Sequence, residues 1–175
     1  IMFVQMMNAM NGTNSAAPLQ FSNVDADFYG MDVDWRYTFN EKWSLNGVLN
    51  YVRGRRDDVR DNLYRVAPTN GFISLNYKQE RWGLSAENFW YDAQNHVSET
   101  NGETRSSGYS LFNLHGYTTI VRALKLSFGI DNLTDKRYAA HLGGVNRVNG
   151  NPDVAPGVRL PGYGRNAFAR VDLRW

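Results

Sequence analysis

The sequence contains no cysteine, so it can form neither a disulfide nor a thiolate metal site. No apolar run approaches the roughly 18 residues that a membrane-spanning helix needs. The formal net charge is only +2 over 175 residues and no basic stripe is visible, which argues against a nucleic-acid partner. The mean hydropathy of −0.51 is typical of a soluble protein. It still permits a membrane barrel, whose strands need an apolar residue only at every second position.

Motifs for catalysis are also missing. The sequence has no Gly-x-Ser-x-Gly elbow, no His-Glu-x-x-His pair and no phosphate-binding loop. Asp57 and Asp58 are neighbours in sequence, and nothing places them on opposite sides of a cleft as paired catalytic carboxylates would be. We therefore predict a protein that is not an enzyme and that needs no cofactor.

What the chain does have is strand-forming aromatics and turn-forming glycine, with 10 Tyr, 9 Phe, 5 Trp and 16 Gly. Residues 28–39 alternate apolar and polar side chains with a period of two, which predicts a strand with one greasy face. The apolar positions are Tyr29, Met31, Val33, Trp35, Tyr37 and Phe39. The same pattern recurs along the chain, so the sequence predicts an all-β, antiparallel protein.

The connections between the predicted strands alternate in length. Short turns are predicted at 40–42, 78–81 and 122–123, and long polar stretches at 8–23, 53–66, 92–108 and 132–163. With strands at 1–7 and 167–175 included, the count is about eight. This alternation is typical of an up-and-down transmembrane β-barrel with short periplasmic turns and long extracellular loops.

Residues 128–142, FGIDNLTDKRYAAHL, resemble the penultimate strand and following loop of TonB-dependent outer-membrane receptors. Three further stretches are similar to pieces of the same family. They are 26–33 (ADFYGMDV), 66–68 (VAP) and 161–165 (PGYGR). Residues 141–148 and 157–162 resemble the copper-receptor branch of that family.

The resemblance implies an outer-membrane protein of a bacterium that takes up a scarce ligand, such as a ferric siderophore, another metal chelate or copper. On this reading residues 1–175 are the C-terminal part of the barrel, without the plug domain and without the segment that engages the TonB complex. The implied partners are the TonB complex, outer-membrane lipid, the metal-chelate ligand and the barrel-assembly machinery. That machinery would recognise the terminal pattern of Val171, Leu173 and Trp175.

Several residues of the predicted outer loops are candidates for ligand binding. Arg55 and Arg56 could hold an anionic chelate, because guanidinium groups bind carboxylate oxygens in pairs. Tyr91 could stack on an aromatic ligand, and His141 and Arg147 lie in the copper-like stretch. For each of them the alternative is an ordinary solvated loop residue, or for Tyr91 a place in the aromatic girdle.

A copper site is a second hypothesis. Met7 and Met10 precede or begin the first long stretch, and thioether sulfur suits Cu(I), so these residues and His141 are candidate metal ligands. The alternative is that methionine fills irregular apolar positions.

Two other classes of protein remain open from the sequence. One is a self-contained small barrel that acts as an anchor or adhesin, which would require residues 1–7 to pair with 171–175. The other is a soluble β-sandwich binding protein.

Overall fold

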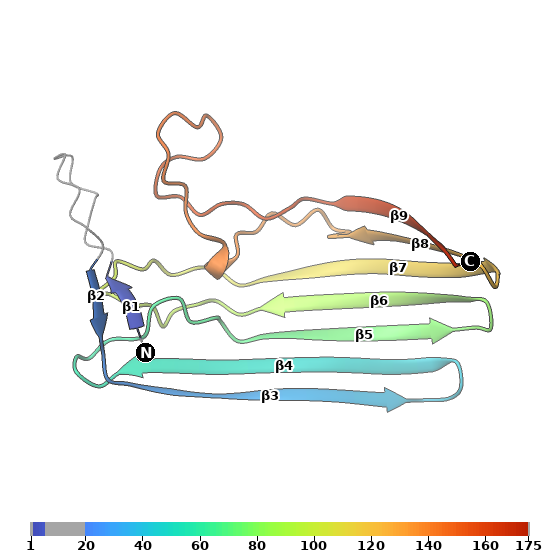
Figure 1. Cartoon of the computed structure of the whole chain (residues 1–175), viewed down its shortest axis with the longest axis horizontal. Coiled ribbons are helices and arrows are strands. Elements are labelled where there is room, and N and C mark those ends of the chain that lie inside the picture. The colour runs from blue at the N-terminus through green and yellow to red at the C-terminus, as the bar shows by residue number, and fades with distance from the viewer. Residues whose placement is uncertain (1, 6–19, 175) are drawn as a thin grey trace.

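The computed structural model describes residues 2–5 and 20–174 of the chain. A hairpin of two strands lies beside one sheet of seven antiparallel strands, in which each strand pairs with its neighbours in sequence (Figure 1). The strands are β1 (Met2–Gln5), β2 (Gln20–Asn23), β3 (Ala26–Thr38), β4 (Trp43–Arg56), β5 (Asn70–Lys78), β6 (Trp82–Tyr91), β7 (Tyr109–Val121), β8 (Leu124–Asp131) and β9 (Asn166–Leu173). The described helical structure is one 3-10 turn, η1 (His141–Gly143).

One face of the sheet is apolar along its whole width. The register places one residue of each strand in a single cross-strand row, because side chains alternate between faces and directly paired residues share a face. This row is Tyr37, Leu45, Leu75, Ala86, Leu114, Ile130 and Ala167. Leu75 and Leu114 are 40% and 43% exposed, as expected for side chains that face a lipid phase.

The other face is polar. Its corresponding row runs through Thr38, Ser44, Asn76, Ser85 and His115. The long strands β3, with 13 residues, and β4, with 14, therefore have one apolar face and one polar face. The predicted two-faced β-sheet is confirmed.

The predicted alternation of connections is also confirmed. Short turns at 39–42, 79–81 and 122–123 lie along one edge of the sheet, which we call the inner edge. The segments 57–69, 92–108 and 132–165 leave the opposite edge (Figure 1), and we call them the first, second and third outer loops. The third outer loop is the longest of these and contains η1.

The structure differs from the sequence prediction in the number and pairing of strands. The sheet has seven strands and not eight, because β1 pairs with β2, which lies in a stretch predicted to be loop. Within the described residues β9 pairs only with β8, so the sheet is open between β3 and β9. β4 also continues to Arg56, where the sequence predicted loop, because Ala26 and Asp27 of β3 pair with Arg56 and Arg55.

Buried apolar side chains are found in the loops and not on the sheet. Among the described residues the hydrophobic side chains classed as buried are Leu63, Val66 and Val97, all in the first and second outer loops. Leu63 packs so closely on β4 that a methyl group at Gly54 would lie 2.6 Å from its Cδ1 atom. The described part of the chain has no helix long and apolar enough to cross a membrane, a finding that does not bear on a β-barrel.

Candidate functional site

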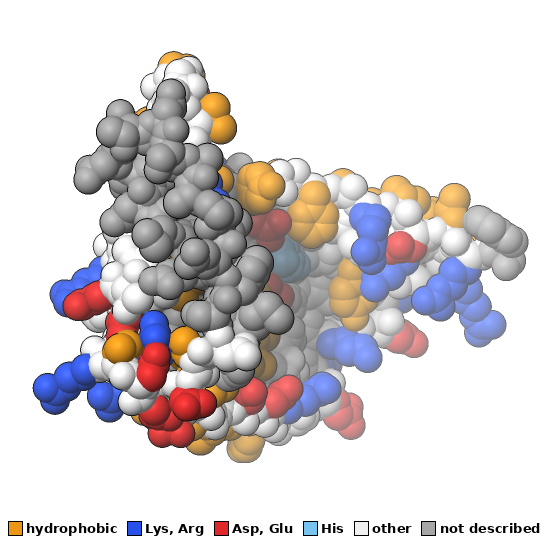
Figure 2. Space-filling view, turned by 60° about the vertical axis from the view of Figure 1, so that its left-hand side comes forward, with side chains coloured by type: hydrophobic (Ala, Val, Ile, Leu, Met, Phe, Trp, Pro, Cys, Tyr) orange, Lys and Arg blue, Asp and Glu red, His pale blue; other side chains and the backbone are white. Residues whose placement is uncertain are grey.

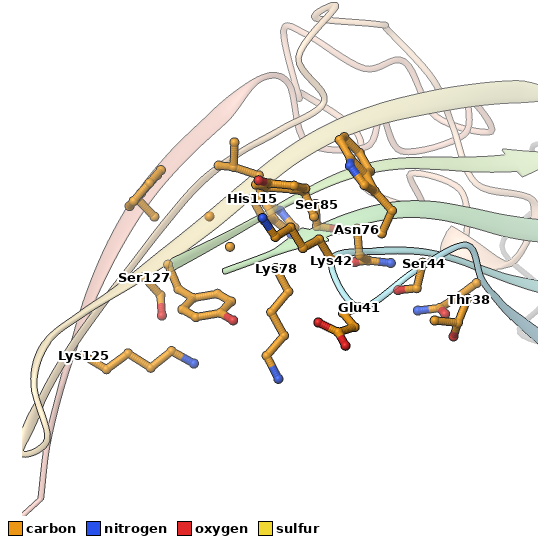
Figure 3. Close-up of a pocket in the computed structure, with 18 of the residues that line it drawn as sticks. Thr38, Glu41, Lys42, Ser44, Asn76, Lys78, Ser85, His115, Lys125 and Ser127 are labelled. Atoms are coloured by element: carbon orange, nitrogen blue, oxygen red, sulfur yellow. The ribbon is translucent and has the colours of Figure 1, made fainter. Parts of the chain in front are cut away.

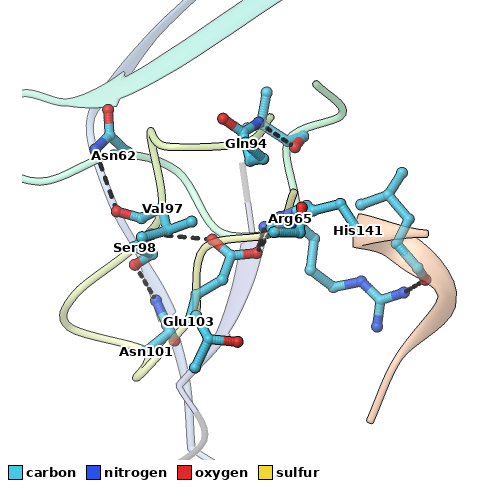
Figure 4. A network of polar contacts seen from close by, with 12 residues as sticks. Asn62, Arg65, Gln94, Val97, Ser98, Asn101, Glu103 and His141 are labelled. Atoms are coloured by element: carbon cyan, nitrogen blue, oxygen red, sulfur yellow. Dashed lines mark hydrogen bonds and ion pairs between the residues drawn. The ribbon is translucent and has the colours of Figure 1, made fainter. Parts of the chain in front are cut away.

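Two of the sequence-predicted site residues, His141 and Arg147, lie in the third outer loop, and the buried His141 joins this loop to the second. The ring of His141, in η1, lies between Ser106 and Glu103 of the second outer loop (Figure 4). Its Nδ1 is 3.0 Å from Ser106 Oγ, and its Nε2 is 3.1 Å from Glu103 Oε1. A carboxylate can only accept, so Nε2 carries the proton and donates to Glu103. In the neutral ring Nδ1 then accepts from the Ser106 hydroxyl.

Glu103 is the centre of this arrangement. Besides His141, its carboxylate accepts the backbone N–H groups of Arg65 at 3.0 Å and Ser98 at 2.9 Å. Its side chain is only 6% exposed, and burial works to raise its pKa. The hydrogen bonds from His141, Ser98 and Arg65 outweigh burial, so the pKa of Glu103 is lowered and the group stays ionised.

Asp61 holds the first outer loop to the second in the same manner. Its carboxylate accepts hydrogen bonds from the Ser98 hydroxyl and from the backbone N–H groups of Glu99 and Thr100, at 2.9 to 3.0 Å. It also accepts the N–H of Asn62 at 2.8 Å. Burial raises the pKa of Asp61, but these hydrogen bonds overcome it and lower the pKa to about 2.

Two arginines connect all three outer loops through backbone carbonyls. Arg65 Nη2 donates to the carbonyl of Leu142 at 2.8 Å. Arg159 Nη1 donates to the carbonyl of His141 at 2.6 Å, and its Nη2 contacts Thr104. The outer loops are therefore tied into one body, which we call the loop cap.

A tyrosine stack attaches the loop cap to the strands beneath it. The rings of Tyr91 and Tyr109 are stacked with centroids 4.8 Å apart, and Tyr138 lies 4.5 Å from Tyr109. The chain at Gly162 passes against Tyr138 so closely that a methyl group there would lie 2.2 Å from the ring. Tyr91 thus lies at the outer end of the sheet, where it could border a ligand, but one face of its ring is occupied by Tyr109.

The motif that begins the third outer loop closes it onto the last strand. Asn132 has a left-handed backbone (φ 49°), and its side chain binds both the N–H and the carbonyl of Lys136, at 2.8 and 2.9 Å. Asp135 accepts the N–H of Arg165 at 2.9 Å. Residues of the 132–138 motif therefore form hydrogen bonds that close the third outer loop.

Residues 3–133 match the protein family described as TonB dependent receptor-like, beta-barrel. The chain belongs to this family. A probable hemoglobin and hemoglobin-haptoglobin-binding protein of Haemophilus influenzae is 28% identical over an alignment of 158 positions that covers 76% of this chain and 16% of that protein. The solved structure of copper transporter OprC is similar with a TM-score of 0.81 at 26% identity, over 89% of this chain and 24% of that one.

Another solved structure shares the fold at lower identity. The ferric citrate transporter FecA has a TM-score of 0.64 at 16% identity, over 98% of this chain and 27% of that one. The chain thus spans about a quarter or less of the length of the relatives described here. The resemblance that the motif at 128–142 carried is confirmed, and the family is one of receptors and transporters.

Of the three predicted arginines, Arg55 and Arg56 end β4 and Arg147 lies in the third outer loop. The Nε and Nη2 atoms of Arg56 both bind the carboxylate of Asp58, and this interaction lowers the pKa of Asp58. Arg55 is exposed near the outer end of β4, and Arg147 is exposed in the third outer loop. The structure does not place the three in one site.

Positive charge does gather near His96 in the second outer loop. Burial lowers the pKa of His96, and the charges of Arg53, Arg105 and Arg55 lower it further. Arg53 and Arg55 lie on β4, on the same face as Leu45, and Arg105 lies in the second outer loop, so the three are separated in sequence. We call these three arginines and His96 the cationic group.

The predicted metal ligands are not assembled in the described structure. Met7 and Met10 lie outside the described residues, so their part in a copper site stays a prediction. Both ring nitrogens of His141 are engaged, so metal binding would require it to release Ser106 or Glu103. The described residues contain no group of three or more His, Cys, Asp or Glu side chains arranged to hold a metal ion.

Two of the three predicted assembly-signal residues can be placed. Val171 and Leu173 pair with Leu126 and Leu124 and are 59% and 62% exposed on the apolar face. Trp175 lies outside the described residues. Recognition of these residues by assembly machinery stays a prediction.

The polar face of the sheet carries one further cluster that sequence reasoning missed. His115 Nε2 lies 2.8 Å from Asp131 Oδ1, and its Nδ1 lies 3.4 Å from Glu87 Oε2. The three residues come from β6, β7 and β8, so only the strand register brings them together. Each ring nitrogen faces a carboxylate, which makes the cluster a structural link across three strands.

Proposed function

We propose that this chain forms part of the wall and the outer loops of a receptor that imports a metal chelate or copper across a bacterial outer membrane with energy from the TonB complex. The cationic group carries the proposal. The charges of three guanidinium groups act on His96, and two of these arginines lie at the outer end of β4, where an anionic chelate arriving from outside would first meet the receptor. The lack of any catalytic motif supports a transport role.

The loop cap supports the same function. Because Glu103, Asp61, Arg65 and Arg159 join three loops, a ligand that contacts one loop would act on all three. The ligand would be captured between the cap and the polar face of the sheet. Movement of a plug in the lumen would then release it inward.

Two ligand classes have specific support. Likeness to copper transporter OprC at 26% identity favours copper, with Met7, Met10 and His141 as its ligands. Identity of 28% to a hemoglobin-binding protein favours a haem-containing ligand. The cationic group favours an anionic ferric chelate over free copper ions, because like charges would repel a cation.

The test is a binding titration of the full-length receptor, purified in detergent, against ferric siderophores of different charge, Cu(I) under reducing conditions, and haemoglobin. We expect an anionic ferric chelate to bind with a Kd of about 1 μM or tighter. Arg55→Glu should weaken it tenfold or more, since the field at the cap is reversed locally. Arg174→Glu, beyond the inner end of β9, is the matched control and should leave binding unchanged.

Three outcomes would contradict the proposal, either as a whole or in the ligand it favours. Failure of every ligand to bind would refute uptake of these substrates. Equal effects of the two substitutions would refute the role of the cationic group. Tight Cu(I) binding that is lost in Met7→Leu and Met10→Leu would establish copper in place of an anionic chelate.

A further inference from the structure

The sequence contains several pairs in which glycine directly follows asparagine. Glycine has no side chain to shield its backbone nitrogen, so this nitrogen can approach the side-chain amide of the preceding asparagine. Because the pairs share this local chemistry, differences in reactivity between them come mainly from the fold. The pairs within the described residues are Asn46-Gly47, Asn70-Gly71, Asn101-Gly102 and Asn149-Gly150, while Asn11-Gly12 lies outside them.

Asn149 and Gly150 form an exposed turn at the tip of the third outer loop. This tip stands well above the sheet (Figure 1), and the space-filling view shows it projecting at the top of the molecule (Figure 2). Gly150 has a left-handed backbone (φ 86°), and a methyl group added to it would meet nothing within 4 Å. Within the described part of the chain, neither the Asn149 side chain nor the Gly150 N–H has a hydrogen-bond partner.

The chain on either side of this turn is fixed. The Asn146 side chain donates to the carbonyls of Val148 and Val154, at 3.0 and 2.6 Å. Its Oδ1 accepts the N–H of Val148 at 3.0 Å. These bonds hold the two arms of the loop together below the tip. The backbone of Asn149 can therefore turn toward its own side chain without breaking a hydrogen bond between described residues.

The two pairs in strands are restrained by the sheet. Gly47 and Gly71 lie in β4 and β5, and each is in register with a residue on both sides, so its N–H belongs to the hydrogen-bond ladder. Asn46 lines the hollow on the polar face that Ser44 and Asn76 also line (Figure 3). In this pair the paired backbone is what prevents the glycine nitrogen from reaching the asparagine side chain.

The pair in the second outer loop is held by two hydrogen bonds. The Gly102 N–H donates to the carbonyl of Glu99 at 3.0 Å, so this nitrogen is already engaged. The Asn101 side chain donates to the Ser98 hydroxyl at 2.8 Å. Both groups that would have to react are thus fixed by other partners, although this pair lies in a loop as Asn149 does.

We propose that Asn149 is a site of deamidation, at which asparagine becomes aspartate or isoaspartate with water as the only co-reactant. The backbone nitrogen of Gly150 forms a bond to Cγ of Asn149, and the bond between Cγ and Nδ2 breaks. The amide group leaves as ammonia, taking the proton of the Gly150 nitrogen, and a five-membered cyclic imide remains. Water then adds to either carbonyl carbon of the ring, which returns a proton to the nitrogen and leaves one carboxylate. Nothing is oxidised or reduced.

The reaction would add a negative charge to the tip of the third outer loop. Between positions 145 and 158 the charged residues are Arg147 and Asp153, so the formal charge of this segment changes from zero to −1. The effect of this charge on uptake rests on the proposed function. Asn149→Asp, which imitates the product, should weaken binding of whichever anionic ferric chelate binds in the titration above. The loss should be about twofold per unit of ligand charge at roughly 10 Å in water. Asn149→Gln should leave binding unchanged, and equal binding of the two variants would overturn this effect.

The test of the site is peptide mass spectrometry of the full-length receptor, purified in detergent and incubated at alkaline pH, where a backbone nitrogen loses its proton more readily. We expect Asn149 to react fastest of the four described pairs. Asn101 is the matched control in a loop. Each of its two hydrogen bonds makes the free state about 2- to 12-fold rarer, so it should react roughly 5- to 150-fold more slowly. Asn46 and Asn70 should stay intact, because only opening of the sheet would free them.

The receptor unfolded in urea gives the reference rates. There all four pairs should react at similar rates, because the hydrogen bonds that restrain three of them are lost. In the folded receptor, Ser98→Ala removes one of the two bonds at the control pair. It should therefore speed the reaction at Asn101 about 2- to 12-fold while Asn149 keeps its rate. Asn149→Gln should give no product at this position, because the larger ring that it would have to form closes less readily.

Three results would overturn the proposal. They are an Asn149 that stays intact in the folded receptor, a reaction at Asn101 as fast as that at Asn149, and the same ratios of the four rates in the folded and unfolded chains. None of these rate measurements uses an imported ligand. If Asn149 is converted while no metal chelate binds, the proposed function fails and the modification site stands. If a chelate binds while Asn149 stays intact, the modification site fails and the proposed function stands.

Discussion

Replacing Glu103 with Gln should loosen the loop cap without unfolding the sheet. The carboxylate accepts Arg65 N–H and His141 Nε2–H on Oε1, and Ser98 N–H on Oε2. An amide has one oxygen, so in Glu103→Gln either Ser98 or the other two donors face an NH₂ group. A buried donor left without an acceptor costs about 1–3 kcal/mol. Since 1.4 kcal/mol is a factor of ten, the open state of the cap should become about 5- to 150-fold more populated.

Hydrogen exchange of the full-length receptor in detergent would measure this. The amide of Ser98 should exchange faster by that factor, because it is protected through Glu103 itself, while amides in the middle of β6 should be unchanged. Glu99→Gln is the matched control, since Glu99 is exposed and only its backbone N–H takes part in the cap. Unchanged protection of Ser98 in Glu103→Gln, or the same change in Glu99→Gln, would refute Glu103 as the centre of the cap.

Three further predictions follow from the same geometry. The pKa of Asp61 is lowered from 3.8 to about 2, so its ionised form stabilises the cap above pH 4 and this contribution, about 1 kcal/mol after solvent screening, is lost as the pH falls toward 2. Hydrogen exchange of the amides that Asp61 binds should therefore gain protection between pH 2 and pH 4. Arg159→Lys should speed protease cleavage of the third outer loop several-fold, because one ammonium cannot replace a guanidinium that contacts two chain segments. Gly129→Ala would place a methyl group 2.4 Å from a histidine ring on β7, so it should cost about 1–3 kcal/mol and lower the yield of the heat-modifiable folded band, whereas Gly143→Ala, with 3.5 Å to its nearest neighbour, should not.

The two-faced sheet could be predicted from the sequence because alternation is a local property. The alternation within residues 28–39 is enough to predict the strand, its apolar face and the turn that follows, and no other segment is needed. Pairing is not local in the same way. Residues 2–5 read as a strand of the sheet, but whether they pair with 20–23 or with the last strand depends on distant backbone groups that no pattern in residues 1–7 reports.

The loop cap could not be predicted for a different reason. Glu103 and Asp61 lie in polar stretches where an acidic residue is usually solvated, and their burial results from loops that are 37 to 39 residues apart in sequence. The sequence suggests a ligand role for His141, and in the structure both of its ring nitrogens are used in bonds between loops. A cap of this kind has no periodicity, so it leaves no signal in a single sequence.

The placement of buried groups explains why the loops should be more sensitive to single polar substitutions than the strands. The sheet presents apolar side chains to lipid on one face and polar ones to the lumen on the other, so neither face packs against a second protein layer within the described residues. Its cohesion comes from the hydrogen-bond ladder between strands, which lipid strengthens by excluding water. The loop cap has only Leu63, Val66 and Val97 as buried hydrophobic side chains among the described residues, and polar contacts of Glu103, Asp61, Arg65 and Arg159 join its loops. Single polar substitutions should therefore open the cap while leaving the strands paired, which is the behaviour that capture and release of a ligand require.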